Sequence, residues 1–394
     1  MLKRPLYTGC ADWSTSEFLS VLGSVASGHV VSGNNITTLS QTFKDRYQSA
    51  GAFAVNSGRT AIRLILEALQ KRAPGKSEVI IPAYICPSLP MAVVASRLRP
   101  VSVDIEADLN VSPATVAAAI DGNTLAVVVP HMYGCPAQIS RMEELCAARG
   151  IFLIDDAAQV VGVAVGGRTL GSFGAFGVIS FAQSKAIVAG LSGAGGMLLV
   201  NDHSFLKCIE PSIQALPCPS RRFRAYMQFA GDYLLDPLSH ELAYYFLRAL
   251  KALGLESAPD ILPAARISNF EAGIALCQLT RLGEVLSEKR RVANLYQKHL
   301  GSAPGFEFPQ YAAGRFLSRI MLRVPAGDAA ERVWRQLKAR HIQIRRGYPT
   351  FISGLGPTPN ALLASTRLIE APFYRGIKEA SIHQFCKTLA AVAP

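Results

Sequence analysis

Short apolar runs alternate with amphipathic helical segments from residue 52 to residue 200, and this alternation constrains the fold more than any other feature of the sequence. Compact apolar runs bounded by glycine, proline or charge are typical of buried strands, whereas the segments between them have apolar residues at helical spacing. Strands and helices in this order favour parallel βαβ units. We therefore predict an α/β domain with a mainly parallel sheet that helices cover on both faces.

Two acidic residues end one of these runs. Residues 151–154 predict a buried strand, and Asp155 and Asp156 follow it directly. A carboxylate at the end of a buried strand is costly unless a cation meets it, and the carboxyl edge of a parallel sheet is where ligands bind. Asp156 is therefore a candidate site residue, and a helix N-cap is the alternative interpretation.

A lysine follows a second apolar run. Residues 178–181 predict a strand that carries Ser180, and Lys185 comes 185 − 156 = 29 residues after Asp156. An acid and an amine at two strand ends suit a cofactor with a basic ring nitrogen and an aldehyde, and pyridoxal phosphate has both. Taken alone, this lysine has a second interpretation as a solvated surface residue.

Two turns add weaker signals. The strand 52–55 is followed by a turn with Gly58, Arg59 and Thr60 and then by a helix. This arrangement presents N–H groups and a favourable dipole to a phosphate, although many helices that bind nothing begin in the same way. The proline-flanked turn 82–87 carries Tyr84 and Cys86, which either cover a bound ring or pack within the loop.

Length and composition exclude several classes of protein. The 394 residues, of which 50% are hydrophobic and 17% charged, predict one large and one smaller domain. No run approaches the roughly 18 uncharged apolar residues of a membrane span, so we expect an unexported, cytoplasmic chain. The eight cysteines lack metal-ligand spacing, and we expect reduced thiols and no metal. The net charge of +12 favours a phosphorylated small molecule or a membrane surface over nucleic acid, because no nucleic-acid recognition motif is present.

The sequence changes character after residue 202, so that a large cofactor-binding domain would comprise residues 1–202. Residues 203–263 are rich in arginine and aromatic residues and predict a helical insertion. Its part at 221–250 would contact a lipid surface or a partner chain, or would pack on the body of the protein. Residues 264–394 predict a long amphipathic helix and a small α+β domain. The elements expected in that domain are a strand at 316–324, a helix at 329–340, a strand at 341–345 and a closing helix at 382–392.

Taken together, these segments resemble the DegT/DnrJ/StrS family of pyridoxal-phosphate sugar aminotransferases, which have aminotransferase fold type I. The resemblance covers nearly the whole chain and rests on several motifs in a fixed order: NSG, VIIPAY, VDIEADLN, PHMYGCPAQI, IDDAAQ, SFAQSK with trailing glycines, and RISNFEAGIALCQLTRL. It implies a seven-stranded sheet in the large domain, a smaller C-terminal α+β domain, and a homodimer in which each site is built from two chains.

The resemblance also assigns roles to individual residues. Lys185 falls on the lysine that holds the cofactor as a Schiff base, Asp156 on the carboxylate at the ring nitrogen, and Gln159 on the residue near the phenolic oxygen. The other implied cofactor contacts are Gly58, Arg59, Thr60, Tyr84, Cys86 and Ser180. The implied substrate contacts are His131, Tyr133 and Arg266.

Several positions depart from the family pattern, among them Arg59, Cys86, Gln138 and Ala264. Arg59 stands where threonine is common, Cys86 where an aromatic ring usually stacks on the cofactor, and Ala264 where an asparagine reaches in from the partner subunit. The related dehydratases have histidine in place of the lysine, so Lys185 favours transamination. The resemblance implies transfer of an amino group from glutamate to a keto group of a nucleotide-linked sugar, in polysaccharide or antibiotic biosynthesis. The alternatives are a non-sugar or lipid-linked ketone as acceptor, and a non-catalytic regulatory or scaffold protein.

Overall fold

The computed structural model describes residues 13–190, 195–219, 263–309, 318–325, 330–340, 342, 344–351, 353 and 356–392. Most of the helical insertion predicted at 203–263, with the possible membrane contact at 221–250, lies outside these residues. Within the described ranges, no helix is both long enough and apolar enough to cross a membrane.

Seven strands form the central sheet, in the order β1-β9-β8-β5-β4-β2-β3. All neighbouring pairs are parallel except those of β9, which runs antiparallel to both β1 and β8. The prediction of a mainly parallel sheet is thus confirmed. The bounds are β1 (Gly51–Val55), β2 (Glu78–Pro82), β3 (Arg99–Val103), β4 (Thr124–Pro130), β5 (Phe152–Asp156), β8 (Phe176–Ser180) and β9 (Gly196–Val200).

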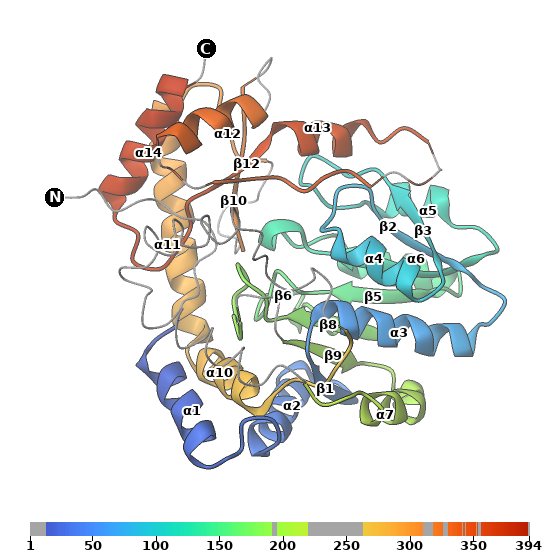
Figure 1. The fold of residues 1–394 in the computed structure, drawn as a ribbon. Coiled ribbons are helices and arrows are strands. Elements are labelled where there is room, and N and C mark those ends of the chain that lie inside the picture. The colour runs from blue at the N-terminus through green and yellow to red at the C-terminus, as the bar shows by residue number, and fades with distance from the viewer. Residues whose placement is uncertain are drawn as a thin grey trace, which may run out of the picture.

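Helices pack along this sheet, as the ribbon in Figure 1 shows. The apolar side of α3, with Ile62, Ile65, Leu66 and Leu69, is buried against it, as the helical spacing predicts. The helices of this part of the chain are α3 (Gly58–Arg72), α4 (Ser88–Ala95), α5 (Pro113–Ala119), α6 (Ile139–Ala148) and α7 (Leu206–Gln214). A short hairpin of β6 (Ala164–Val165) and β7 (Arg168–Thr169) lies outside the main sheet.

Two helices precede the sheet. A capping box begins α1 (Thr15–Ala26), where the Glu17 carboxylate accepts the N–H of Ser14 at 2.8 Å. The second helix, α2 (Asn34–Tyr47), begins where the glycine-containing segment after α1 ends. Both helices pack against α10 (Asn269–Thr280), which lies far along the chain.

The long amphipathic helix predicted after residue 264 is instead two helices, α10 and α11 (Leu282–His299). They meet at Arg281, whose backbone leaves the helical region at φ −98° and ψ 8°. The guanidinium of Arg281 donates to Glu17 Oε1 at 2.6 Å, and Glu17 is fully buried. The interruption therefore coincides with an ion pair that joins α10 and α11 to α1, and sequence periodicity does not register such a pair.

The C-terminal part has its own sheet and apolar core. Three strands are ordered β10-β12-β11, and residues from α11, α12 and α14 pack around them. Figure 1 shows α11 running from the large domain toward this region. The domain limits at 202 and 264 remain predictions. The bounds are β10 (Ile320–Arg323), α12 (Ala330–Ala339), β11 (Arg345–Arg346), α13 (Pro359–Arg367), β12 (Leu368–Ala371) and α14 (Glu379–Val392), of which the sequence did not predict α13 and β12.

A second attachment joins this region to the edge of the large sheet. The N–H of Phe351 donates to Ala83 O at 2.7 Å, and the N–H of Ser353 donates to Ser102 Oγ at 2.9 Å. Farther on, the carboxylate of Asp104 accepts the N–H groups of Asn360 and Ala361, at 3.1 and 2.8 Å, in the first turn of α13. The C-terminal domain is therefore bonded to the loops after β2 and β3 as well as continuous with α11.

Candidate active site

The candidate site lies at the carboxyl edge of the sheet, between β5, β8 and the start of α3. Strands β5 and β8 are parallel neighbours, with Asp156 opposite Val178 in the register. Asp156 therefore ends its strand beside the strand that leads to Ser180 and Lys185. The sequence predicted this meeting of the acid and the lysine from the two strand ends.

Asp156 is 9% exposed, and its Oδ1 accepts the N–H of Ala158 at 3.1 Å. Burial raises the pKa of this carboxyl, while the charge of Lys185, the N–H of Ala158 and His131 act in the opposite direction. A buried carboxylate with one backbone donor still favours a cationic group at its other oxygen. A protonated ring nitrogen is such a group.

Lys185 is half-buried, and its pKa is lowered from the usual 10.5 to about 8. Burial is the main cause and the nearby positive charge of Arg319 is the second, whereas Cys86, Asp156 and Glu370 act in the opposite direction. A lysine with such a pKa has a substantial uncharged fraction near neutral pH. It can therefore act as a nucleophile toward an aldehyde.

The residue before the lysine is conformationally unusual. Ser184 has φ of 70°, in the left-handed region that non-glycine residues rarely adopt. Its side chain is buried, and its Oγ has no hydrogen-bond partner in the part of the chain that the structure describes. Strained backbone of this kind and an unsatisfied buried hydroxyl are concentrated at functional sites.

The first turn of α3 provides the groups that suit a phosphate. Ser57 caps the helix by accepting the N–H of Thr60 at 3.1 Å, and Thr60 Oγ1 donates to Asn56 Oδ1 at 2.6 Å. Residue 58 has no side chain, and a Cβ there would lie 3.3 Å from Ser180 Cβ. The space beside the Ser180 hydroxyl and the N-terminus of α3 is thus left open, and Arg59 lies in the same helical turn.

These residues fit pyridoxal phosphate. The site offers an amine of lowered pKa, a buried acid on the neighbouring strand, and a serine hydroxyl beside a helix N-terminus. They are the groups that the aldehyde, the ring nitrogen and the phosphate of the cofactor require. Within the described part of the chain, no group of three or more histidine, cysteine, aspartate or glutamate side chains is arranged to hold a metal ion.

Three tyrosines lie beside the site. Tyr84 Oη accepts the N–H of Tyr348 at 3.0 Å and lies 2.8 Å from Tyr133 Oη, while the rings of Tyr133 and Tyr348 are stacked at 5.5 Å. If Tyr84 directs its proton to Tyr133, the proton of Tyr133 remains for another acceptor. Burial raises the pKa of both Tyr84 and Tyr133, so both stay protonated at neutral pH.

Gln159 holds Tyr133 in place. Its Oε1 accepts the N–H of Tyr133 at 3.2 Å and the hydroxyl of Ser318 at 3.0 Å. Tyr133 itself has φ of 50°, so its backbone is also in the left-handed region. The structure thus brings together Gln159 and Tyr133, two residues that the sequence analysis names as site candidates. The third member of this cluster, Ser318, is not among those candidates.

His131 follows the end of β4 and is fully buried. Its Nδ1 accepts the N–H of Ala137 at 3.0 Å, so its ring proton is on Nε2, which donates to Asp155 Oδ1 at 2.8 Å. The other oxygen of Asp155 accepts the N–H groups of Gly171 and Phe173 at 2.6 and 3.1 Å. Both ring nitrogens are thus used inside the protein, and the expected substrate contact of His131 remains a prediction.

Two more predicted residues have partners of their own. The guanidinium of Arg266 donates to the carbonyl oxygens of Leu216, at 3.1 Å, and of Gln214, at the C-terminal end of α7. Cys86 lies in the turn before α4, with its Sγ 3.1 Å from Ser88 Oγ. The substrate contact expected of Arg266 and the ring contact expected of Cys86 remain predictions.

The C-terminal domain contributes an ion pair that the sequence analysis missed. Arg319, just before β10, pairs with Glu370 of β12 at 3.3 Å, and its guanidinium lies 5.4 Å from the ring centre of Tyr348. Glu370 is 1% exposed. A signal was present, because a charged residue within an apolar strand needs a partner, and both residues fall in such runs.

Comparison with known proteins agrees with this site. A model of the DegT/DnrJ/EryC1/StrS aminotransferase family matches residues 14–390. GDP-perosamine synthase of Vibrio cholerae is 27% identical over 303 residues, which are 76% of this chain and 71% of that protein. UDP-N-acetyl-3-dehydro-alpha-D-glucosamine 3-aminotransferase of Acidithiobacillus ferrooxidans is 36% identical over 278 residues, 70% of this chain and 64% of the relative.

A shorter match and two solved structures extend the comparison. L-glutamine:2-deoxy-scyllo-inosose aminotransferase of Streptomyces kanamyceticus is 37% identical over 153 residues, 39% of this chain and 35% of the relative. PseC of Helicobacter pylori, an aminotransferase, superimposes with a TM-score of 0.80 at 14% identity, over 99% of both chains. The aminotransferase TlmJ of Streptoalloteichus hindustanus gives 0.78 at 23% identity, over 98% of both. These two structures share the fold of this chain.

Proposed function

We propose a substrate class for this chain, which belongs to the DegT/DnrJ/EryC1/StrS aminotransferase family and is a pyridoxal-phosphate-dependent aminotransferase. It transfers an amino group from glutamate to a keto group of a nucleotide-linked sugar. The observation that carries the proposal is that Lys185, with its lowered pKa, and Asp156 follow the ends of adjacent strands and influence one another electrostatically. Relatives that act on GDP-, UDP- and dTDP-linked sugars support the acceptor class.

Each residue of the site has a task in this reaction. The bound cofactor supplies an electron sink for removal of a proton next to the substrate nitrogen. Asp156 keeps the ring nitrogen protonated, and Ser180 and the first turn of α3 hold the phosphate. Lys185 Nζ would hold the cofactor and would move the proton next to the substrate nitrogen, for which an amine with a pKa of about 8 is well matched.

The tyrosines and the C-terminal domain shape the rest of the site. Tyr133 Oη, fixed by Tyr84 and stacked on Tyr348, offers a hydrogen bond to a polar group of the substrate. Arg319 keeps positive charge near Lys185, and this charge favours the uncharged amine. The net charge of +12 is consistent with an anionic nucleotide-linked acceptor.

A second acceptor class has a specific observation in its favour. The relative from Streptomyces kanamyceticus is named for glutamine as donor and 2-deoxy-scyllo-inosose as acceptor, and it matches at 37% identity over 39% of this chain. A cyclitol ketone is therefore the alternative acceptor, and glutamine the alternative donor.

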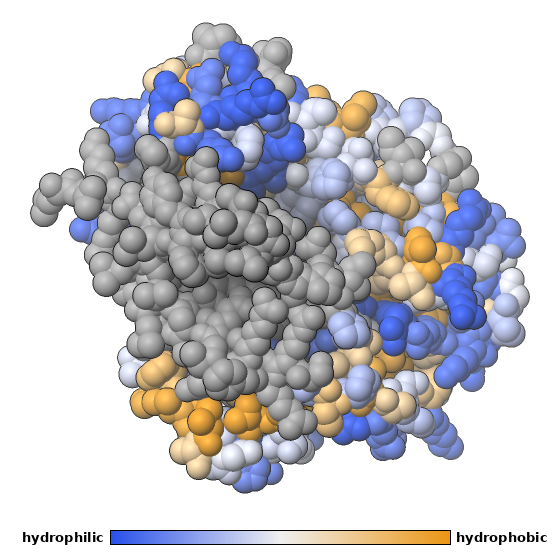
Figure 2. Space-filling view, viewed as in Figure 1, coloured by the Kyte–Doolittle hydropathy of each residue, from blue (hydrophilic) through white to orange (hydrophobic). Residues whose placement is uncertain are grey.

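A homodimer is part of the proposal. The outer side of α1 exposes Leu19, Leu22 and Val25, by 59%, 38% and 40%. Figure 2 shows hydrophobic side chains gathered over this helix at the lower left. Contiguous exposed apolar residues favour contact with another chain. Light scattering coupled to size-exclusion chromatography should give twice the chain mass, and a monomeric mass would contradict the proposal. A cytoplasmic location also remains part of the proposal.

The function is tested by following the absorbance of the protein-bound cofactor. Glutamate should bleach the cofactor band of the wild-type protein, and a keto-sugar nucleotide should restore it and yield an aminated sugar. If glutamine bleaches the band and only a cyclitol ketone restores it, the alternative is correct. A coloured protein that no amino donor bleaches would contradict both.

A further inference from the structure

A polar cavity of about 390 Å³ lies between α1 and the first turns of α2 and α10. Its volume is within the range of about 300–1,000 Å³ that small-molecule sites have. Serine, asparagine and histidine side chains and two glycines line it, with no carboxylate and no apolar side chain among the described residues. No residue predicted or described here as a contact of the cofactor or its substrates is among them, so this cavity is separate from the candidate active site.

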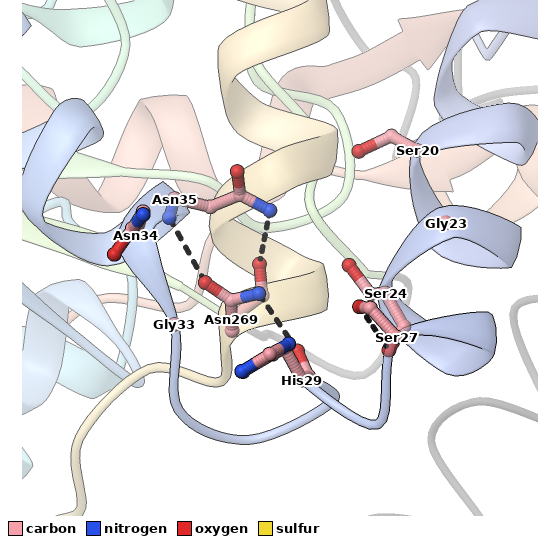
Figure 3. Close-up of a pocket in the computed structure, with 9 residues that line it drawn as sticks. All are labelled: Ser20, Gly23, Ser24, Ser27, His29, Gly33, Asn34, Asn35 and Asn269. Atoms are coloured by element: carbon pink, nitrogen blue, oxygen red, sulfur yellow. Dashed lines mark hydrogen bonds between the residues drawn. The ribbon is translucent and has the colours of Figure 1, made fainter.

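The wall formed by residues 29–35 is fixed in place by Asn269. The N–H of Asn35 donates to Asn269 Oδ1 at 3.0 Å, and Asn269 Nδ2 donates to the carbonyl of His29 at 2.7 Å (Figure 3). Asn35 Nδ2 also donates to Asn269 O at 3.2 Å. A Cβ on Gly33 would lie 2.7 Å from the side chain of Asn269. The cavity is thus preformed, because the loop and the first turn of α10 fit closely.

The first turn of α2 presents donors to this cavity. Gly33 at the N-cap position offers no side-chain acceptor, and Asn269 Oδ1 satisfies only the N–H of Asn35. The N–H of Asn34, which lines the cavity, has no partner among the residues that the structure describes. Together with the dipole of this 14-residue helix, it creates a local preference for negative charge.

A second, independent feature comes from α1. Ser24 is 5% exposed, and its hydroxyl makes no hydrogen bond within the described ranges of the chain. Figure 3 shows this hydroxyl pointing from α1 into the space in front of Asn269 and Asn35. A serine in a helix can return its proton to the preceding turn, and because Ser24 makes no such bond, its hydroxyl is available to a group bound in the cavity.

We propose that this cavity binds the phosphoryl group of a small phosphorylated molecule, held by the Ser24 hydroxyl and the N-terminus of α2. Donors meet from two helices, and none of the described residues that line the cavity carries a carboxylate. The volume leaves room for the organic part of a phosphate monoester beside the phosphoryl group. This site is additional to the proposed aminotransferase reaction and does not depend on it.

The test is calorimetric titration of the protein saturated with pyridoxal phosphate, so that the cofactor's phosphate site is already filled. The probes are inorganic phosphate and glucose 6-phosphate, which distinguish a site for the free ion from one for a monoester. Ser24→Ala should weaken binding of the effective probe about ten- to hundredfold, as expected for loss of a hydrogen bond to a charged group. Thr38→Ala, an exposed position on α2 outside the cavity, is the matched control and should bind as the wild type does.

Hydrogen–deuterium exchange of the backbone amides shows where on the protein the probe binds. The effective probe should slow exchange of the amides of residues 34–36 in the wild type and in Thr38→Ala, and should not do so in Ser24→Ala. The proposal would be overturned if neither inorganic phosphate nor glucose 6-phosphate binds at millimolar concentration. Equal affinity of Ser24→Ala and the wild type would overturn it as well. Because Ser24→Ala only removes one oxygen atom, its circular dichroism spectrum should match that of the wild type and validate the comparison.

Discussion

Replacing Arg319 by glutamine should raise the pKa of Lys185 and slow capture of the cofactor at neutral pH. Burial and the positive charge of Arg319 together lower the pKa of Lys185 from 10.5 to about 8. At pH 7, a lysine with a pKa of 10.5 is uncharged in about one molecule in 3,000, and one with a pKa of 8 in about one in ten.

The magnitude follows from the surroundings of the pair. Removal of Arg319 deletes one lowering influence and leaves Glu370, which is 1% exposed, without its ion-pair partner. An unpaired carboxylate nearby stabilises charged Lys185, so both effects have the same sign. We expect the pKa to rise by about 1, which lowers the uncharged fraction and the capture rate at pH 7 about tenfold.

The assay is stopped-flow absorbance of apoprotein mixed with pyridoxal phosphate between pH 6 and pH 10. Because only the uncharged amine reacts, the wild-type rate should rise with pH and reach half its maximum near pH 8. This midpoint should move upward in Arg319→Gln and return in Arg319→Lys, which keeps the charge. Arg323→Gln is the matched control, because Arg323 lies on β10 but pairs with the exposed Glu307 at 2.9 Å.

Stability has to be measured alongside. Removing one partner of a buried ion pair costs about 3–5 kcal/mol, so circular dichroism must show that Arg319→Gln is folded in the assay. The reasoning is refuted if folded Arg319→Gln keeps the wild-type midpoint, or if the midpoint moves to lower pH.

Three further predictions concern the centre of the site. Lys185→Ala should lose the cofactor colour and all amine transfer, since no other amine is held at this strand end; measurable turnover by spectrophotometry would contradict the assignment. Asp156→Asn should keep the fold yet lower kcat at least about a hundredfold, as loss of an electrostatic group does, and near-normal steady-state kinetics would show that the ring nitrogen lies elsewhere. Gly196→Ala should destabilise the protein by about 1–3 kcal/mol in urea unfolding, because its Cβ would lie 2.7 Å from Gly58 N, and an unchanged midpoint would mean that the first turn of α3 can yield.

The sequence predicted the part of the fold that local patterns encode. Buried strands and amphipathic helices follow from periodicity, and parallel pairing follows from their alternation, so the sequence alone predicts Asp156 and Lys185 at one edge of the sheet. Periodicity carries no strand direction, however, and the antiparallel pairing of β9 could not be read from it. Likewise, a continuous apolar pattern predicted one helix where the structure has two, which meet at Arg281.

The same limit applies to the site. Residues contributed by adjacent strand ends were predictable, because the sheet brings such ends together. Arg319 and Tyr348 come from the C-terminal part of the chain. The approach of Arg319 to Lys185 and to the ring of Tyr348 depends on tertiary packing that no local motif records. His131 and Arg266 occupy motif positions, yet both side chains make hydrogen bonds to other groups of the protein. A motif position does not reveal which hydrogen bonds a side chain makes.

The bonds from Phe351, Ser353, Asn360 and Ala361 to the large sheet have a mechanical consequence. A domain connected to its neighbour at one point can rotate about that point as a hinge. A domain connected at two separate points cannot rotate in this way without breaking one of the attachments. The C-terminal domain is continuous with α11 and is also bonded at the loops after β2 and β3. These two attachments oppose rotation of the C-terminal domain relative to the large sheet, and Arg319 and Tyr348 belong to the part that they restrain.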